Sequence, residues 1–62
     1  MLRGSQDGYA YMISSQPQRG GSALWYWAVT RELDFATVAF GQSLSEAGAR
    51  DDVLKAIHSQ LP

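Results

Sequence analysis

The seven residues from Ala23 to Val29 (Ala-Leu-Trp-Tyr-Trp-Ala-Val) constrain the fold of this chain more than any other stretch. They carry no charge, and they hold both tryptophans and one of the three tyrosines of a 62-residue sequence. Alternate residues of a strand point to opposite faces of its sheet. One face would then hold Trp25, Trp27 and Val29, and the other Leu24, Tyr26 and Ala28. Because both sets are apolar, a sheet built on this strand needs cover on both sides.

Two further apolar segments alternate in the way that is typical of strands. We expect strands at residues 9–13, 23–30 and 35–40, with Gly41 ending the third. The connection at 14–22 contains Pro17 and two adjacent glycines, and the charged connection at 30–34 contains Asp34, so both indicate turns. Connections without a crossover helix favour an antiparallel meander. Residues 1–8 hold two glycines and few apolar side chains, and we expect them to form a frayed lead-in.

The pattern changes to that of a helix at Ser43. Ser43 and Glu46 have the spacing of a capping box, in which each side chain bonds to the other residue's amide. Apolar residues then recur at helical spacing, at Ala47, Leu54, Ile57 and Leu61, with Leu44 and Val53 beside them. Acid-before-base pairs, Glu46 with Arg50 and Asp51 with Lys55, are expected on the outer face.

The sequence therefore predicts one α+β domain over residues 1–62, in which a three-stranded antiparallel meander is followed by one C-terminal helix packed on one face. A single helix covers only one face of a sheet, and an exposed apolar patch of more than a few hundred Å² marks an interface. We expect a homodimer, formed by packing of this second face or by pairing of strand edges.

For the helix we favour Leu24, Tyr26 and Ala28 as the covered face, which leaves the tryptophans for the partner. The candidate interface residues are Tyr9, Tyr11, Trp25, Trp27, Val29 and Phe35.

Composition favours a protein-interaction role. Charged residues make up 18% of the chain, below the roughly 25% of a typical soluble domain. The net charge is −1 and the five basic residues are scattered singly, whereas nucleic-acid binding usually needs a basic cluster. Two alternatives stay open: a single-stranded nucleic-acid binder that uses Trp25 and Trp27 as a stacking platform, and a small mobile-element inhibitor of a host protein.

No arrangement of residues predicts catalysis, a cofactor or a metal site. His58 is the only histidine, and there are no cysteines. The adjacent Asp51 and Asp52 would point about 100° apart on a helix, so they do not form a carboxylate pair. We expect a non-enzymatic protein. The longest apolar run is far shorter than the roughly 20 residues that span a bilayer, and no apolar segment of a signal peptide follows Met1, so we expect a cytoplasmic location.

The C-terminal third resembles the last strand and helix of HicB-like antitoxins. The similarity lies in residues 36–47, Ala-Thr-Val-Ala-Phe-Gly-Gln-Ser-Leu-Ser-Glu-Ala, and in the Val-Leu-Lys-Ala-Ile run at 53–57. The family's proline-containing segment between its second and third strands and its appended DNA-binding module are missing here. The resemblance implies neutralisation of a partner protein and oligomerisation through the sheet.

Overall fold

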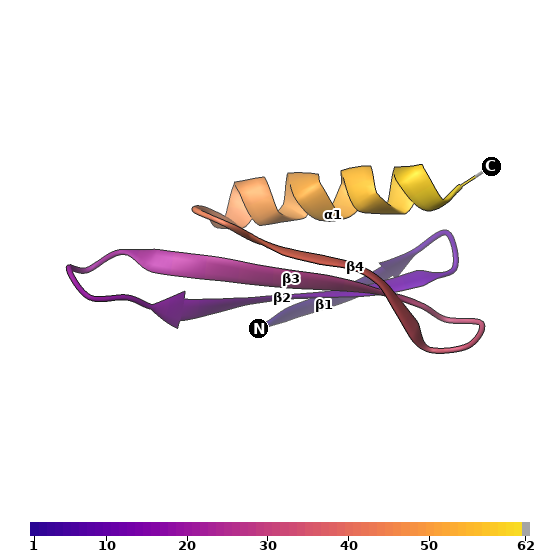
Figure 1. Ribbon diagram of the computed structural model, residues 1–62, viewed down its shortest axis with the longest axis horizontal. Coiled ribbons are helices and arrows are strands. Elements are labelled where there is room, and N and C mark those ends of the chain that lie inside the picture. Colours follow the sequence, from indigo (N-terminus) through magenta and orange to yellow (C-terminus); the bar gives the residue numbers. More distant parts are fainter. Residues whose placement is uncertain (62) are drawn as a thin grey trace.

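The computed structural model, which describes residues 1–61, contains four strands followed by one helix. The elements are β1 (Leu2–Gln6), β2 (Tyr9–Pro17), β3 (Ala23–Arg31), β4 (Ala36–Ser43) and α1 (Glu46–Gln60). The strands form one antiparallel sheet in chain order, and α1 lies across one face of it (Figure 1). The predicted α+β class and the C-terminal helix packed on the sheet are confirmed. The predicted number of strands is wrong, because the sheet has four rather than three.

The additional strand comes from the segment expected to be a frayed lead-in. Leu2–Gln6 pairs with β2 in a register that runs from Leu2 opposite Ile13 to Gln6 opposite Tyr9. Asp7 and Gly8 connect the two strands, with φ of 54° and 83°. Two successive residues with positive φ are what a two-residue hairpin turn requires, and Asp-Gly is among the strongest signals for it. The turn chemistry therefore decides the structure of this segment, despite its low content of apolar residues.

The hydrophobic core lies between the tryptophan face of the sheet and the helix. Tyr9, Ile13 and Val29 from the sheet are buried together with three helix residues, Ala49, Val53 and Ile57. Both tryptophans are partly buried and pack against this cluster. The arrangement with Leu24, Tyr26 and Ala28 under the helix is therefore wrong. Burial stabilises in proportion to apolar area, and the face with two indole rings has more area to remove from water.

The helix begins two residues later than the predicted capping box requires. Its N-cap is Ser45, whose Oγ accepts a hydrogen bond of 3.0 Å from the amide of Gly48. Ser43 instead ends β4, where it pairs with Trp25. Continued strand pairing keeps Ser43 in the sheet, so the predicted box with Glu46 does not form. The buried helical positions are Ala49, Val53 and Ile57, four residues apart, while Leu54 is exposed.

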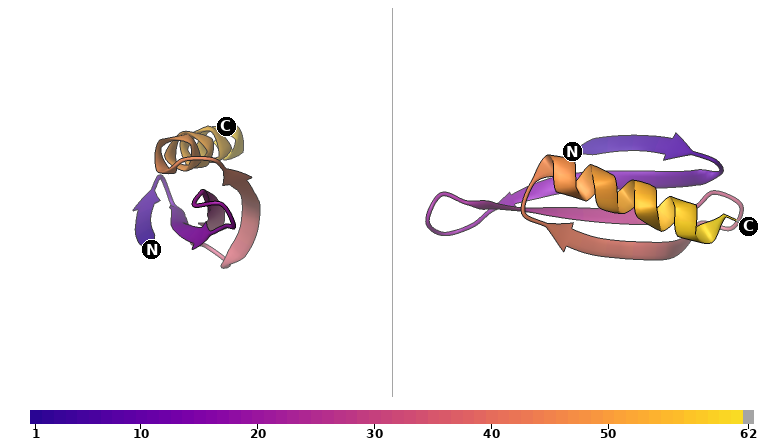
Figure 2. Two further views of the ribbon diagram at one scale, coloured as in Figure 1. Left: turned by 90° about the vertical axis from the view of Figure 1, so that its left-hand side faces the viewer. Right: turned by 90° about the horizontal axis from the view of Figure 1, so that it is seen from above.

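A β-bulge adjusts β4 to the core. Val29 pairs with Ala39 and Thr30 with Thr37, which leaves Val38 as an extra residue between the two pairs. A bulge of this kind opposes two residues to one on the neighbouring strand. Val38 and Ala39 accordingly both pack against the core. The molecule is 41 Å long because the β2–β3 hairpin projects beyond the N-terminal end of α1 (Figures 1 and 2).

Candidate protein-interaction surface

Five of the six predicted interface residues lie on the face of the sheet that the helix covers. Tyr9 and Val29 belong to the buried core, and Tyr11, Trp25 and Trp27 are partly buried against it. These five side chains come together in and around the core on the side of α1, and so they do not face away from the helix.

The sixth predicted residue, Phe35, lies outside the sheet. It was expected to begin the third strand, but it lies in the β3–β4 turn with φ of 58°, and 83% of it is exposed. A positive φ is uncommon for a residue with a bulky side chain. The turn is held by Asp34, whose Oδ1 accepts a hydrogen bond of 3.2 Å from the amide of Ala36. Phe35 is therefore separate from both faces of the sheet.

The opposite face of the sheet has no helix over it (Figure 2). We call it the open face and define it by its apolar residues, Met12 on β2, Leu24, Tyr26 and Ala28 on β3, and Phe40 on β4. These residues alternate with the core residues on their own strands, which places them on the other side of the sheet. Sequence reasoning named Leu24, Tyr26 and Ala28 for the helix, and it did not single out Met12 or Phe40 for an interface.

A transverse apolar row crosses the middle of the open face. Met12 pairs with Ala28, and Ala28 pairs with Phe40, so the three side chains follow one another across three strands. Met12 is 37% exposed and Phe40 is 79% exposed. Neighbouring strands are about 4.8 Å apart, so the row forms a continuous line. The small Ala28 between two large side chains makes the centre of the row a hollow.

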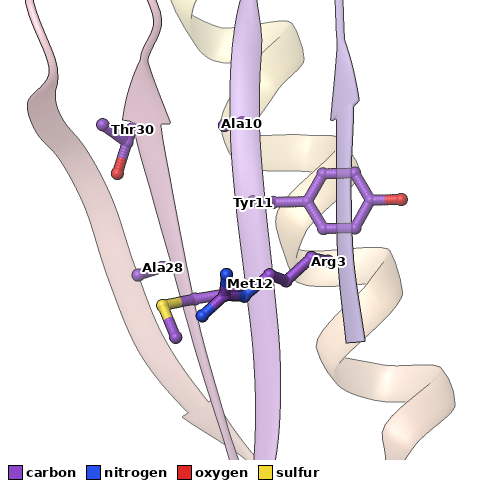
Figure 3. A pocket seen from close by; sticks show the side chains of 6 residues that line it. All are labelled: Arg3, Ala10, Tyr11, Met12, Ala28 and Thr30. Atoms are coloured by element: carbon purple, nitrogen blue, oxygen red, sulfur yellow. The ribbon is translucent and has the colours of Figure 1, made fainter. Parts of the chain in front are cut away.

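A depression of about 180 Å³ lies beside this row. Its lining residues are Arg3, Ala10, Tyr11, Met12, Ala28 and Thr30 (Figure 3). Figure 3 shows Arg3 and Met12 close together, as their pairing between β1 and β2 requires. Within residues 1–61, Arg3 is the single charged residue among the positions that alternate onto this face. The open face is thus apolar at its centre and carries its one charge at the β1 side.

The ion pairs of the molecule lie away from the open face. Arg50 contacts Glu46 at 2.9 Å and Lys55 contacts Asp51 at 2.9 Å, which confirms both predicted helical pairs. The hydrogen bond with Asp51 raises the pKa of Lys55. All four side chains are exposed, and exposed pairs of this kind contribute little to stability.

The strongest electrostatic effect is in the β3–β4 turn. Arg31 donates two hydrogen bonds to Asp34, at 3.0 and 2.8 Å. These bonds, with the one from the Ala36 amide, lower the pKa of Asp34 from 3.8 to about 2. The same contact raises the pKa of Arg31. Asp34 thereby stabilises the turn and is not available as a proton donor near neutral pH.

The described residues hold no cluster of metal-binding side chains. Across residues 1–61, no three histidine, cysteine, aspartate or glutamate side chains are close enough to hold a metal ion. His58 is exposed near the end of α1. Over the same residues, α1 is too short and too polar to cross a membrane. The open face is therefore the candidate interaction surface.

Comparison of the chain with protein-family models, with curated proteins and with solved structures finds no match. The resemblance to HicB-like antitoxins therefore stays a prediction from the sequence.

Proposed function

We propose that this protein is a small, non-enzymatic protein–protein interaction protein that forms a homodimer by packing the open face of its sheet against the same face of a second copy. The observation that carries the proposal is the exposed row of Met12, Ala28 and Phe40 across the middle of an uncovered sheet face. Protein interfaces typically bury apolar side chains of this kind at their centre. A regulatory or antitoxin-like role in the cytoplasm is part of the proposal.

A two-fold contact suits the shape and the charge of this face. In an isologous interface the same residues meet from both sides, so a hollow must be matched by a projection on the same surface. Ala28 supplies the hollow, and Met12 and Phe40 on either side supply the projections. Arg3 pairs with Met12 at the β1 end of the row, away from its centre at Ala28. No like charges therefore meet where the two faces pack.

The positions of the tryptophans weigh against the nucleic-acid alternative. A stacking platform needs aromatic rings that are open to an incoming base. Trp25 and Trp27 pack against the core under α1, and the open face holds Arg3 as its only charge among the described residues. We therefore do not extend the proposal to nucleic acid.

The substitution Ala28→Lys tests the proposal. A lysine at the hollow would be buried unpaired in the interface, a cost of several kcal/mol, so the dimer should weaken at least about 100-fold. Light scattering or sedimentation at roughly 1 to 100 µM should then show half the molar mass of the wild type. Circular dichroism and tryptophan emission should be unchanged, because the indoles lie on the other face.

A matched control adds the same charge elsewhere. Gln60→Lys places a lysine at the exposed end of α1, far from the open face, and should leave the molar mass at the wild-type value. An Ala28→Lys protein that keeps the wild-type mass would refute the face-to-face contact.

A further inference from the structure

The strand β4 has one unpaired side. It is the last strand in the sheet order and bonds to β3 alone among the described elements. An edge strand presents a row of free N–H and C=O groups that can pair with another strand, and proteins usually protect such an edge with charges or prolines. The eight residues of β4, Ala-Thr-Val-Ala-Phe-Gly-Gln-Ser, contain neither. This edge lacks the common side-chain protections.

The opposite edge of the same sheet is protected. β1 has five residues, and it carries the charged Arg3. The ring of Tyr11 lies across β1 at Gly4, where a Cβ would collide with the phenol. Figure 3 shows this ring crossing β1, with its hydroxyl on the outer side of the strand. An incoming strand would meet a charge and an aromatic ring at β1, but neither of these at β4.

The bulge at Val38 limits how much of β4 is free to pair. A bulge bends its strand and increases the local twist, so the residues before it diverge from a straight edge. Regular pairing with β3 runs from Ala39 to Ser43. Five residues on each side are a short but ordinary length for a strand pair.

We propose that residues 39–43 of β4 pair in antiparallel fashion with the same residues of a second copy, which joins the two sheets into one continuous sheet. Self-pairing places the segment beside the same segment of the second copy, so a segment with a net charge would repel itself. Residues 39–43 carry no charge. Phe40 ends the apolar row beside this edge, and in this register it lies opposite Gln42 of the second copy and diagonal to that copy's Phe40, so the open faces of the two copies adjoin.

This edge contact is additional to the face-to-face contact and does not depend on it. Two different two-fold contacts in each copy join four chains when their axes intersect at right angles, and tetramers with this symmetry are common. We therefore expect the wild type to have the mass of four chains at high concentration, and the Ala28→Lys protein, which lacks only the face contact, to have the mass of two.

Charge variants on the edge test the pairing in the Ala28→Lys protein. Phe40 and Gln42 are exposed and lie within the paired segment. Adding Phe40→Lys and Gln42→Lys places like charges across the two-fold axis, and adding glutamate at both positions does the same with the opposite sign. Each variant should be monomeric. An equimolar mixture of the two should recover the mass of two chains, which a variant that merely unfolds would not do.

Amide hydrogen exchange reads the backbone contact directly. In the Ala28→Lys protein, raising the concentration should slow exchange at least about 10-fold for the outward amides of residues 39–43, and should leave Leu2–Gln6 unchanged. An Ala28→Lys protein that is monomeric at about 1 mM, or a charge mixture that stays monomeric, would overturn the edge contact. Retention of the wild-type mass by Ala28→Lys would refute the face contact instead, and the charge variants would then decide the edge contact in the wild-type background.

Discussion

The substitution Gly48→Ala tests the contact between the first turn of α1 and the end of β4. Gly48 is the third residue of the helix, and its amide donates to the Oγ of the N-cap Ser45. Alanine favours a helix over glycine by about 0.8 to 1 kcal/mol. The structure adds an opposing effect, because a Cβ at this position would collide with the Oγ of Ser43.

The two effects are of similar size. Ser43 must turn its hydroxyl away from the new methyl group, and holding a side chain about 30° from a staggered rotamer costs about 0.5 to 1.5 kcal/mol. Ser45 Oγ would lie 3.1 Å from the Cβ, but a serine cap bonded to the third helical residue accommodates side chains at that residue. We therefore expect Gly48→Ala alone to change the free energy of unfolding by less than about 0.5 kcal/mol.

Removing the Ser43 hydroxyl should release the full helical gain. The Cβ of Ser43 would lie 3.6 Å from that of an alanine at 48, which is an ordinary contact. In a Ser43→Ala background, Gly48→Ala should stabilise by about 0.8 to 1 kcal/mol. The coupling between the two sites is then about 1 kcal/mol, which corresponds to roughly 4 to 8 °C in Tm for a domain of this size.

Thermal and urea unfolding of the wild type, the two single variants and the double variant measure this coupling. All four must be compared at one protein concentration, because association stabilises the folded state by mass action. Additive effects, with Gly48→Ala stabilising by the full amount on its own, would refute the proposed collision with Ser43. A double variant that gains nothing would show that the helical position itself rejects a side chain.

Two further perturbations probe the sheet and the turn. Gly41→Ala would place a Cβ 2.7 Å from Cζ2 and 2.9 Å from Cε2 of the rigid Trp27 ring, so we expect a loss of about 1 to 3 kcal/mol in urea unfolding, and an unchanged stability would contradict the close packing. Asp34 has its pKa lowered from 3.8 to about 2, so it stabilises the fold above pH 3.8, and this contribution is lost as the pH falls to about 2. Asp34→Asn should flatten this part of the pH dependence of Tm, while an unchanged slope would show that the pairing with Arg31 does not matter to folding.

Glycines account for much of what sequence reasoning missed. Because glycine is depleted within strands, the sequence alone predicts a frayed segment around Gly4 and the end of a strand at Gly41. In the structure both lie inside strands, and each faces an aromatic ring, Tyr11 at Gly4 and Trp27 at Gly41. A strand glycine can mark such a close approach as well as a break, and its type alone does not distinguish them. The deciding information is the register, which places Gly41 opposite Trp27.

The hairpin at Asp7 and Gly8 could have been predicted from the sequence. Asp-Gly is a strong turn signal by itself, whereas the mostly polar composition of the flanking residues Leu2–Gln6 favours a frayed segment, and the turn signal is the one that the structure follows. The two alternating sets on β3, in contrast, were assigned correctly from the sequence. The alternation of residues along β3 does not show which of the two sets the helix covers. That choice depends on the total apolar area of each face over all four strands.

The face of the sheet that α1 covers decides which residues are exposed and can mediate association. With the tryptophans under the helix, the exposed apolar surface no longer runs along β3 but crosses the strands, from Met12 through Ala28 to Phe40. Such a row ends at a sheet edge, and here the row ends at β4, the edge without charges. Phe40 therefore belongs to both proposed contacts, and its substitution alone cannot separate them. Ala28, in the central part of the row, reports on the face contact, while the exchange of the β4 amides reports on the edge contact.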